Sequence, residues 1–273
     1  LFPYTTLFRS YYTLSLTTTG VFAFARSVKP LPSAKVLVTY GGIFACVALA
    51  VHLLTLEMEK EQQKLEQTFI EEFDKSTTYE GIALHSPFFV VGDAEQLNRA
   101  LLRISLFSDY QCPLCGYLAN DMLPKIAKRY GKDIAIQYFH YPLDHNCHPK
   151  ITNPFHQMAC KAAYLSSCSG KHFLETHDWL YSNQAKLNDS VLQVKVNELD
   201  VNACYYSEET KDKIVEEIQI AETLGIDATP TLIINGRKLD GIIPLRYVFA
   251  LMDHVLKQEL EKKKKEVALN DSF

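Results

Sequence analysis

The sequence predicts an α/β fold in which a strand–helix–strand unit and a C-terminal β-hairpin with its helix are separated by a helical insertion. One or two transmembrane helices are expected in front of it. Residues 101–107, LLRISLF, form a mostly apolar run of strand length, and residues 133–143 alternate in polarity after a helix-spaced segment. Residues 231–235, TLIIN, lead into Asn235-Gly236, a strong hairpin-turn signal. Residues 36–54 contain no formally charged side chain.

The composition narrows the classes of protein to which the chain can belong. The chain has 273 residues, of which 47% are hydrophobic and 22% charged, so a sizeable core is expected and wholesale disorder is not. A net charge of -4 gives no reason to expect nucleic acid as a partner. Seven cysteines are more than a reduced cytosolic domain of this size usually carries unless they do chemistry.

The first ten residues, LFPYTTLFRS, read as the in-frame translation of a sequencing-adapter oligonucleotide. We therefore exclude residues 1–10 from the fold prediction, and we expect the chain to begin inside its gene, because it lacks an initiator Met. The alternative is a genuine apolar N-terminus, and resequencing the locus with another chemistry distinguishes the two.

Residues 36–54 are long enough to cross a bilayer core of ~30 Å at 1.5 Å per residue. A buried globular helix is the alternative, and the absence of a polar face disfavours it. Residues 11–25 supply a weaker second span because of their threonines, so residues 11–54 are interpreted as a transmembrane remnant. The connecting loop contains Arg26, Lys29 and Lys35 and no acid, which places it in the cytoplasm by the positive-inside rule.

The chain from Thr55 onward is then expected outside the cytoplasm. Residues 55–84 are interpreted as a stalk or linker, and Leu65, Phe69 and Phe73 are spaced as one helix face. We expect this face to pack on its own domain rather than to form a dimer. Cys46 lies inside the span and is interpreted as a small packing residue.

The segment after the first strand contains two cysteines three residues apart, Cys112 and Cys115, in CPLC. Helical spacing follows at Leu118, Met122, Ile126 and Tyr130. This strand–CxxC–helix–strand order is the setting in which CxxC is typical of a redox motif. From about Asn153 to Leu224 the pattern is helical, and a closing helix is expected from Leu245 to Lys262, followed by a frayed tail at 263–273.

Cys112 is predicted at the N-terminus of the following helix, where unpaired N–H groups and the helix dipole favour a thiolate. Pro113 suits the first helical position because its missing N–H would be unused there. Cys115 lies one turn further on and can resolve a mixed disulfide at Cys112. Zinc is an alternative, with candidate ligands His145, Cys147, His148, His156 and Cys160, but a second CxxC is missing. A purely structural CxxC disulfide is a further alternative.

Four segments carry a family resemblance. FSDYQCPLC (107–115), YPLDHNC (141–147), FHQMACKAAYLSSC (155–168) and TPTLIINGR (229–237) closely resemble the DsbA-like thioredoxin domains of bacterial thiol oxidoreductases. They are most similar to the versions fused behind a vitamin K epoxide reductase domain. The resemblance covers about residues 85–260. It implies a thioredoxin-like fold over 85–262, with a helical insertion at about 145–224, and it fits the interpretation of 11–54 as the last pair of membrane spans.

The resemblance also implies further site residues. In that family the proline of Thr229-Pro230 is cis and faces the CxxC, so that the preceding backbone can pair with an extended substrate; a trans proline opening an edge strand is the alternative. Cys147 and Cys160 enclose a short loop and are expected to form a structural disulfide in an oxidising compartment, as the resembled fusions suggest. Cys168 and Cys204 are left for a possible second bridge, which the sequence does not fix.

Two positions depart from the family pattern. Such domains commonly carry an acidic residue six positions before the first cysteine, where this chain has Leu106. Proton transfer from Cys115 must then use water or another group, and Asp109 is expected on the loop. Strongly oxidising DsbA proteins have His before the second cysteine, where this chain has Leu114. We therefore expect a less oxidising couple, which redox titration against glutathione measures.

The sequence thus predicts a protein thiol–disulfide oxidoreductase tethered to the inner membrane, with its thioredoxin domain on the periplasmic side. The resemblance implies oxidation of cysteine-containing exported proteins through Cys112 and Cys115, without a cofactor or metal in the soluble domain. A vitamin K epoxide reductase-like membrane domain with quinone would re-oxidise it. The alternatives are a disulfide reductase or isomerase, and a non-catalytic thioredoxin-fold binding or chaperone module.

Overall fold

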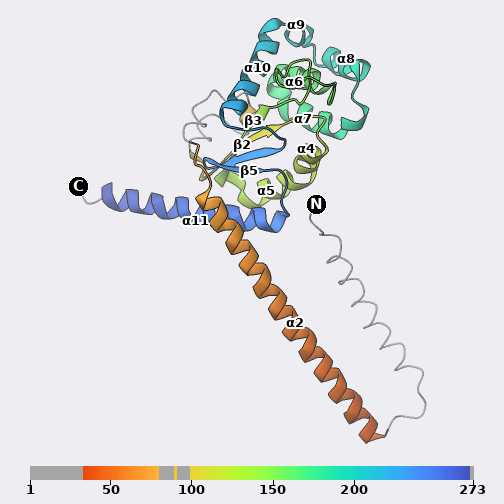
Figure 1. Cartoon of the computed structure of the whole chain (residues 1–273), viewed down its shortest axis with the longest axis vertical. Helices are drawn as coiled ribbons and strands as arrows, with labels where there is room; N and C mark the ends of the chain where they lie inside the picture. The colour runs from red at the N-terminus through yellow and green to blue at the C-terminus, as the bar shows by residue number, and fades with distance from the viewer. Residues whose placement is uncertain (1–32, 80–88, 91–98, 271–273) are drawn as a thin grey trace. The chain divides into compact units, whose positions relative to one another are not determined.

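The computed structural model describes residues 33–79, 89–90 and 99–270, and the chain divides into two units at Lys64 and Leu65 (Figure 1). The expected span at 11–25 and the expected adapter segment at 1–10 lie outside the described residues. The two units are taken in turn.

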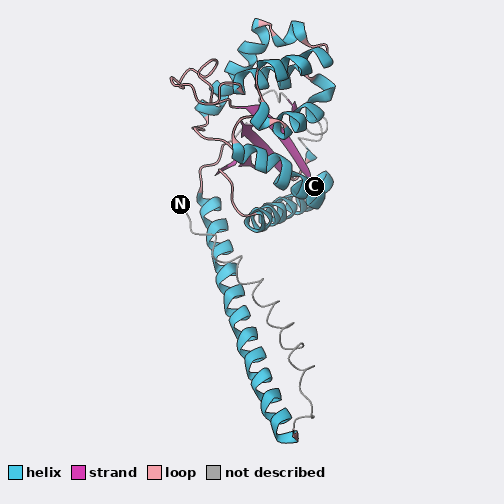
Figure 2. Cartoon of the chain, turned by 90° about the vertical axis from the view of Figure 1, so that its right-hand side faces the viewer, coloured by secondary structure: helices cyan, strands magenta, loops and turns pink. Residues whose placement is uncertain are grey.

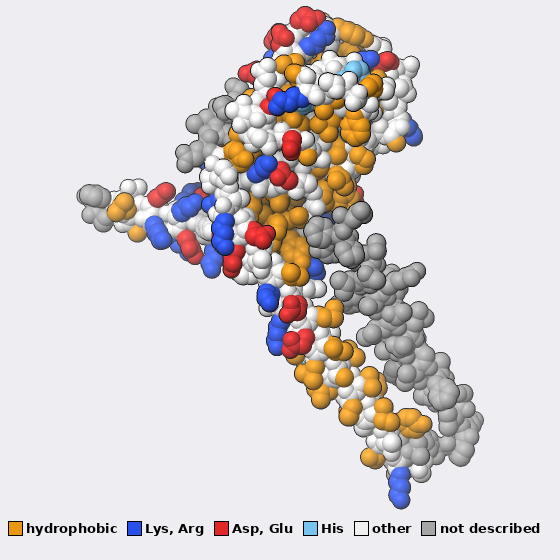
Figure 3. Space-filling model, in the orientation of Figure 1, with side chains coloured by type: hydrophobic (Ala, Val, Ile, Leu, Met, Phe, Trp, Pro, Cys, Tyr) orange, Lys and Arg blue, Asp and Glu red, His pale blue; other side chains and the backbone are white. Residues whose placement is uncertain are grey.

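Helix α2, Ala34–Lys75, supplies the described part of the first unit. Its residues from Val38 are long and apolar enough to cross a membrane, judged by length and composition. The prediction for 36–54 falls on this helix, and Figure 3 shows apolar side chains along it. The exposed apolar side chains there include Val38, Ile43, Phe44, Val47, Leu49 and Leu54.

The last turns of α2 belong to the second unit and pack on it. Phe73 is buried in the core of that unit, and Phe69 packs against the same core. Asp74 pairs with His254 at 2.8 Å, and Arg237 donates to the carbonyl of Ser76 at 2.6 Å. The expectation that this face packs on its own domain is thus confirmed for Phe69 and Phe73. It is wrong for Leu65, which is 56% exposed, because contacts with the domain begin further along the helix.

A five-stranded mixed sheet in the order β1-β3-β2-β4-β5 forms the centre of the second unit. Strands β2, Leu102–Ser108, and β3, Ile134–His140, are parallel. β4, Thr231–Ile234, pairs antiparallel with β2, and β5, Arg237–Asp240, pairs antiparallel with β4. The short edge strand β1, Phe89–Val90, pairs antiparallel with β3 and was not expected from the sequence. The predicted strands are confirmed, with ends shifted by one to three residues.

Helices cover both faces of this sheet (Figures 1 and 2). One face packs Leu102, Ile104 and Leu106 against the helices after the CxxC and the C-terminal helix. The other face packs Phe107 and Phe139, whose rings stack at 4.6 Å, against the insertion. Alternate residues of β2 therefore enter two different cores, as the period of two in a strand requires. The redox motif follows directly at the end of this strand.

The segment after the motif is helical but not uniform. α4, Pro113–Tyr117, continues through a π-helical turn, Leu118–Met122, into α5, Leu123–Tyr130. All four predicted core positions, Leu118, Met122, Ile126 and Tyr130, are buried. Pro124 lies within the first two positions of α5 and lacks an N–H, so the widened turn falls where a regular helical hydrogen bond is missing. A 3₁₀ turn, Gly131–Asp133, then leads into β3.

The chain from Ala159 to Thr223 is mostly helical, as predicted, whereas residues 141–158, which include the predicted helical start near Asn153, form turns and loops. The helices are α6, Ala159–Cys168; α7, Phe173–Ser182; α8, Asp189–Glu198; α9, Asn202–Tyr205; and α10, Glu208–Thr223. Two 3₁₀ turns, Gly170–His172 and Gln184–Lys186, flank α7. The side chains of Asn188 and Ser207 cap α8 and α10 by accepting backbone N–H bonds.

The C-terminal hairpin and helix close the unit. Asn235 and Gly236 have positive φ angles of 47° and 87°, as a two-residue turn between β4 and β5 requires. Helix α11 runs from Leu245 to Asn270. The expectation of a frayed tail from residue 263 is wrong as far as Asn270, because the run KKKKEVAL consists mostly of residues that favour a helix.

Candidate redox site

The CxxC begins helix α4. Cys112 is the N-cap residue with an extended backbone, φ -73° and ψ 118°, and Pro113 follows at the first helical position. The N–H of Cys112 donates to the carbonyl of Asp109 at 3.1 Å, and the carbonyl of Cys112 accepts from the N–H of Gly116 at 3.1 Å. The predicted placement of Cys112 at a helix N-terminus is thus what the structure shows. Both cysteines are free thiols.

The two thiols have different surroundings. The pKa of Cys112 is lowered to about 6, first by a hydrogen bond from the Cys115 thiol. Burial opposes that shift, while the Thr229 hydroxyl and the backbone N–H groups of Cys115 and Leu114 support it. The pKa of Cys115 is raised well above its ordinary value, first by burial and then by the neighbouring Cys112. A thiolate therefore forms at Cys112 while Cys115 keeps its proton.

The peptide bond between Thr229 and Pro230 is cis. The Cys112 thiol lies 3.3 Å from the carbonyl oxygen of Thr229. The buried hydroxyl of Thr229 has no conventional hydrogen-bond partner among the described residues. It lies close enough to both sulfurs to lower the pKa of each. The structure thus brings together the CxxC and the Thr229-Pro230 pair, which are 117 residues apart.

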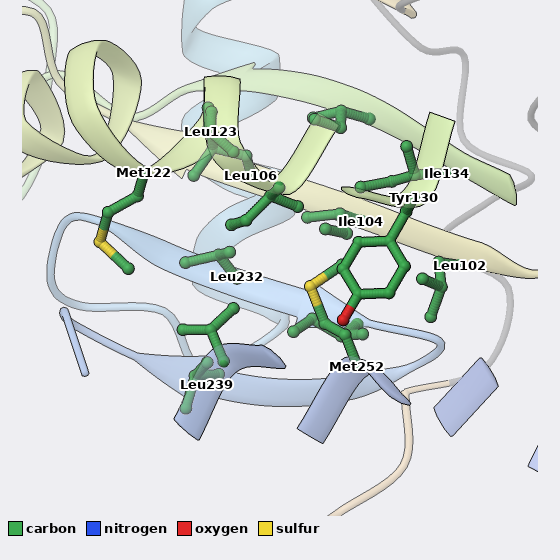
Figure 4. Close-up of a cluster of buried hydrophobic side chains, with 14 of the residues drawn as sticks. Leu102, Ile104, Leu106, Met122, Leu123, Tyr130, Ile134, Leu232, Leu239 and Met252 are labelled. Atoms are coloured by element: carbon green, nitrogen blue, oxygen red, sulfur yellow. The ribbon is translucent and has the colours of Figure 1, made fainter. Parts of the chain in front are cut away.

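The two leucines that depart from the family pattern lie in contrasting places. Leu106 is 2% exposed and points from β2 into the apolar cluster, beside Leu123 and Leu232 (Figure 4). It contributes no group that can exchange a proton with Cys115. Leu114 is 50% exposed and lies at the surface next to Cys112. Neither leucine side chain can stabilise a thiolate by a hydrogen bond.

Asp109 lies on the loop before Cys112, as expected, but its carboxylate is 1% exposed. It accepts from the N–H of Gln111 at 2.6 Å and from the N–H of Leu143 at 2.7 Å. His156 approaches the same carboxylate with Nδ1 at 2.7 Å. Sequence reasoning did not find this pair, because Asp109 and His156 are 47 residues apart.

Gln184 is another residue that the sequence did not indicate. Its side-chain N–H₂ donates to the carbonyls of Tyr110 and Cys112 at 2.8 and 2.7 Å. A Cβ at Gly116 would lie only 2.8 Å from Oε1 of Gln184, so the glycine leaves room for this contact. Gln184 therefore fixes the backbone of the nucleophile from the insertion side.

A buried polar network lies behind the same loop. Both the backbone N–H and Nδ1 of His140 contact the carboxylate of Glu217. Nε2 of His140 lies 2.9 Å from the hydroxyl of Ser166, which lies 2.7 Å from the Tyr110 hydroxyl. The Tyr110 hydroxyl continues to Nδ1 of His177 at 3.0 Å. Burial lowers the pKa of His177 to about 3, so this imidazole is neutral, and the network anchors the residue two positions before Cys112.

Two disulfides join the remaining cysteines of the second unit. Cys147 bonds to Cys160, and Cys168 bonds to Cys204. The first is the pair expected from the sequence and the resemblance, and the second is the bridge that the sequence left open. The first pair uses two of the five residues considered as zinc ligands, and within the described residues no group of three His, Cys, Asp or Glu side chains is arranged to hold a metal.

A CxxC at a helix N-terminus, facing a cis proline on a mixed sheet, defines a redox-type thioredoxin fold. The thioredoxin family model matches residues 91–253, and the chain therefore belongs to that family. Among solved structures it is similar to Wolbachia pipientis alpha-DsbA1, with 22% identity, a TM-score of 0.53, and coverage of 63% of this chain and 92% of that one.

A periplasmic thioredoxin-like protein from Salmonella enterica serovar Typhimurium is similar at 21% identity and a TM-score of 0.51, with 65% and 95% of the two chains covered. Family membership and the site geometry together identify the chain as a thiol–disulfide oxidoreductase with a DsbA-like fold.

A curated relative is named Na(+)/H(+) antiporter NhaA 1, from Mycobacterium sp. strain KMS, and it is 24% identical over 142 residues. The match covers 50% of this chain and 22% of that protein. The chain thus spans about a fifth of the length of the curated relatives that it matches, and the antiporter name describes the relative.

Proposed function

We propose that this protein is a membrane-tethered oxidant that introduces disulfides into exported, cysteine-containing proteins. The observation that carries the proposal is the asymmetry between Cys112, whose pKa is lowered to about 6, and Cys115, whose pKa is raised. A lowered pKa stabilises the thiolate of Cys112 in the reduced protein and makes Cys112 a good leaving group when the mixed disulfide with substrate is attacked, so the oxidised protein gives up its disulfide readily. The protein is then a better oxidant than a pair of ordinary thiols would be.

In the oxidising direction a substrate thiolate attacks the sulfur of Cys112 in the Cys112–Cys115 disulfide. The bond between the two enzyme sulfurs breaks, and Cys115 leaves and takes up a proton, which its raised pKa favours. A second substrate thiolate then attacks the substrate sulfur bound to Cys112, and Cys112 leaves as a thiolate. Two electrons pass from the substrate dithiol to the enzyme dithiol.

The surroundings of Cys112 support an unfolded polypeptide as substrate. The carbonyl of Thr229 lies 3.3 Å from the sulfur, where an extended chain can pair with the backbone beside it. Leu114, Tyr117 and Phe155 are 50%, 49% and 65% exposed. Leu114 and Tyr117 lie on α4 beside Cys112, and the Phe155 ring stacks on His156. Apolar segments that a folded protein hides would bind there.

The proposed location is the extracytoplasmic side of the inner membrane. Helix α2 contains a segment that could serve as the anchor or as a signal. The two disulfides outside the CxxC support an oxidising compartment, because such bonds are reduced in the cytosol of most organisms. For re-oxidation we propose a vitamin K epoxide reductase-like membrane partner that passes the electrons to quinone.

The test uses the full chain in detergent, oxidised, with a reduced and unfolded model protein. We expect disulfides to form in the substrate while one enzyme dithiol appears for each, and we expect Cys112→Ser to be inactive. A titration against glutathione gives the potential. A protein that reduces or isomerises substrate disulfides but does not oxidise dithiols would contradict the oxidant role. Cys115→Ala that traps no mixed disulfide would favour a binding module instead.

A further inference from the structure

The Asp109 carboxylate poses an electrostatic problem for the redox site. It is 1% exposed and lies three residues before Cys112, and its own carbonyl accepts the N–H of Cys112 at 3.1 Å. Two backbone N–H groups, from Gln111 and Leu143, donate to its oxygens at 2.6 and 2.7 Å. A buried negative charge so close to Cys112 opposes the formation of a thiolate there.

His156 supplies the opposite charge. Its Nδ1 lies 2.7 Å from Asp109, and its side chain is 14% exposed. Burial opposes protonation of His156, but the hydrogen bond and the charge of Asp109, with a smaller contribution from Cys112, raise its pKa above the ordinary value. The ring also stacks on Phe155 at 4.1 Å, which restricts its orientation.

The fold presents His156 to the site in a fixed place. The residue lies within the loop that the Cys147–Cys160 disulfide closes. The same loop is tied to the segment before Cys112 a second time, because the N–H of Met158 donates to the side chain of Gln111 at 2.6 Å. The backbone of His156 also donates to the carbonyl of Leu143 at 3.3 Å.

We propose that His156 is a positioning residue of the redox site, whose imidazolium neutralises the buried Asp109 carboxylate and so lets Cys112 carry a thiolate. His156 thus stabilises the Cys112 thiolate from outside the CPLC motif, which the apolar side chain of Leu114 inside the motif cannot do. The inference rests on the proposed thiol–disulfide exchange at Cys112. It makes Asp109, His156 and Cys112 one coupled system rather than three independent groups.

The other charged or titratable groups that face this system are few among the described residues. Asp144, three residues before the bridged loop begins at Cys147, acts on His156, and it is itself held by the N–H groups of Asn146 and Cys160 at 3.0 and 3.1 Å. Cys115 faces Cys112, and Tyr181 faces Cys115 and Asp109. Since Asp144 remains when His156 is replaced, its effect cancels in a comparison of variants.

The test is a double-mutant cycle on the full chain in detergent. The readout is the thiolate absorbance of the reduced protein minus that of the oxidised protein, measured against pH. Cys46 contributes equally to both forms, so its absorbance cancels in this difference. In His156→Gln, which keeps a donor but loses the charge, we expect the pKa of Cys112 to rise by about one unit. In an Asp109→Asn background the same change should shift it by far less. His156→Lys, which restores the charge, should keep the pKa low. His145→Gln, just before the bridged loop and facing Asp144, is the matched control and should leave it unchanged.

An equal shift from His156→Gln in both backgrounds, or no shift in either, would overturn the inference. So would His156→Lys behaving like His156→Gln, because the effect would then come from the ring and not from its charge. The proposed function fails separately: it falls if the unaltered protein reduces or isomerises substrate disulfides but does not oxidise dithiols, whatever the pKa shifts in these variants.

Discussion

Cys112 and Cys115 lie three residues apart at the start of one helix, yet their sulfurs have different surroundings. Cys112 is the N-cap, accepts a hydrogen bond from Cys115, and lies beside Thr229. Both cysteines belong to one apolar cluster with Tyr110 and Tyr181, in which Cys112 is 7% exposed and Cys115 only 1%. The helix start favours negative charge in general, but burial decides which of the two thiols carries it. The comparison assigns attack to Cys112 and resolution to Cys115.

The largest expected effect comes from removing each sulfur. Cys112→Ala should reduce thiol–disulfide exchange to the uncatalysed background, because the reactive thiolate is lost. Cys115→Ala should keep the first attack and accumulate a mixed disulfide with substrate, which non-reducing electrophoresis detects. Cys46→Ala is the control and should match the unaltered protein. Equal residual activity in the two active-site variants would contradict the assignment.

Leu106→Glu tests the apolar side chains that pack beneath the redox site. A carboxyl group placed among Leu123 and Leu232 should destabilise the fold by roughly 2–4 kcal/mol, since it lacks a partner there. It should also change the pH dependence of exchange, because a group that can exchange a proton now lies under Cys115. Leu106→Met, of similar volume, separates packing from proton transfer. A pH profile identical to that of Leu106→Met would show that this position does not matter.

Thr229→Val removes a hydroxyl that lowers the pKa of both cysteines. An interaction of a hydroxyl with a charged group is worth at most about 1.5–3 kcal/mol, so the pKa of Cys112 should rise by up to about one to two units. Exchange near pH 6 should slow accordingly. The measurement is the rate of alkylation against pH, with Thr231→Val, at the first residue of β4, as the control. A fall in the pKa of Cys112 in this variant would contradict a stabilising role of the Thr229 hydroxyl.

The smallest effect concerns stability. Because the pKa of Cys112 is lowered to about 6, while an unfolded thiol titrates near ~8.5, its stabilising contribution is lost as pH falls through about 6 and is complete above ~8.5. The raised pKa of Cys115 acts in the opposite direction above ~8.5. The melting temperature of the reduced protein should therefore rise relative to the oxidised protein between pH 6 and 8.5. Parallel curves across that range would mean that the shift is absent.

The strands, the helix after the CxxC and the hairpin could be predicted because their signals are local. An apolar run, a helical period at Leu118, Met122 and Ile126, and the turn at Asn235-Gly236 are each contained within a short window. The cis bond at Pro230 came from the family resemblance, which also supported the Cys147–Cys160 pair, while the Cys168–Cys204 pair stayed open because spacing alone does not determine which distant residues meet.

The features that sequence reasoning missed depend on long-range contacts. His156 meets Asp109 across 47 residues, and Gln184 reaches the carbonyl of Cys112 across 72. The edge strand Phe89–Val90 has only two residues, too few for an alternating pattern. Helix α11 exceeds its predicted end at Lys262 because lysine and alanine favour a helix even where no core stabilises them.

The central claim is the asymmetry of the two sulfurs, and site-resolved alkylation of the reduced protein tests it most directly. Brief treatment with iodoacetamide from pH 4 to 10, followed by mass spectrometry of the peptides, gives a separate profile for each cysteine. We predict an alkylation midpoint near pH 6 for Cys112 and no appreciable labelling of Cys115 below pH 9. Similar midpoints for both cysteines, or a lower one for Cys115, would contradict it.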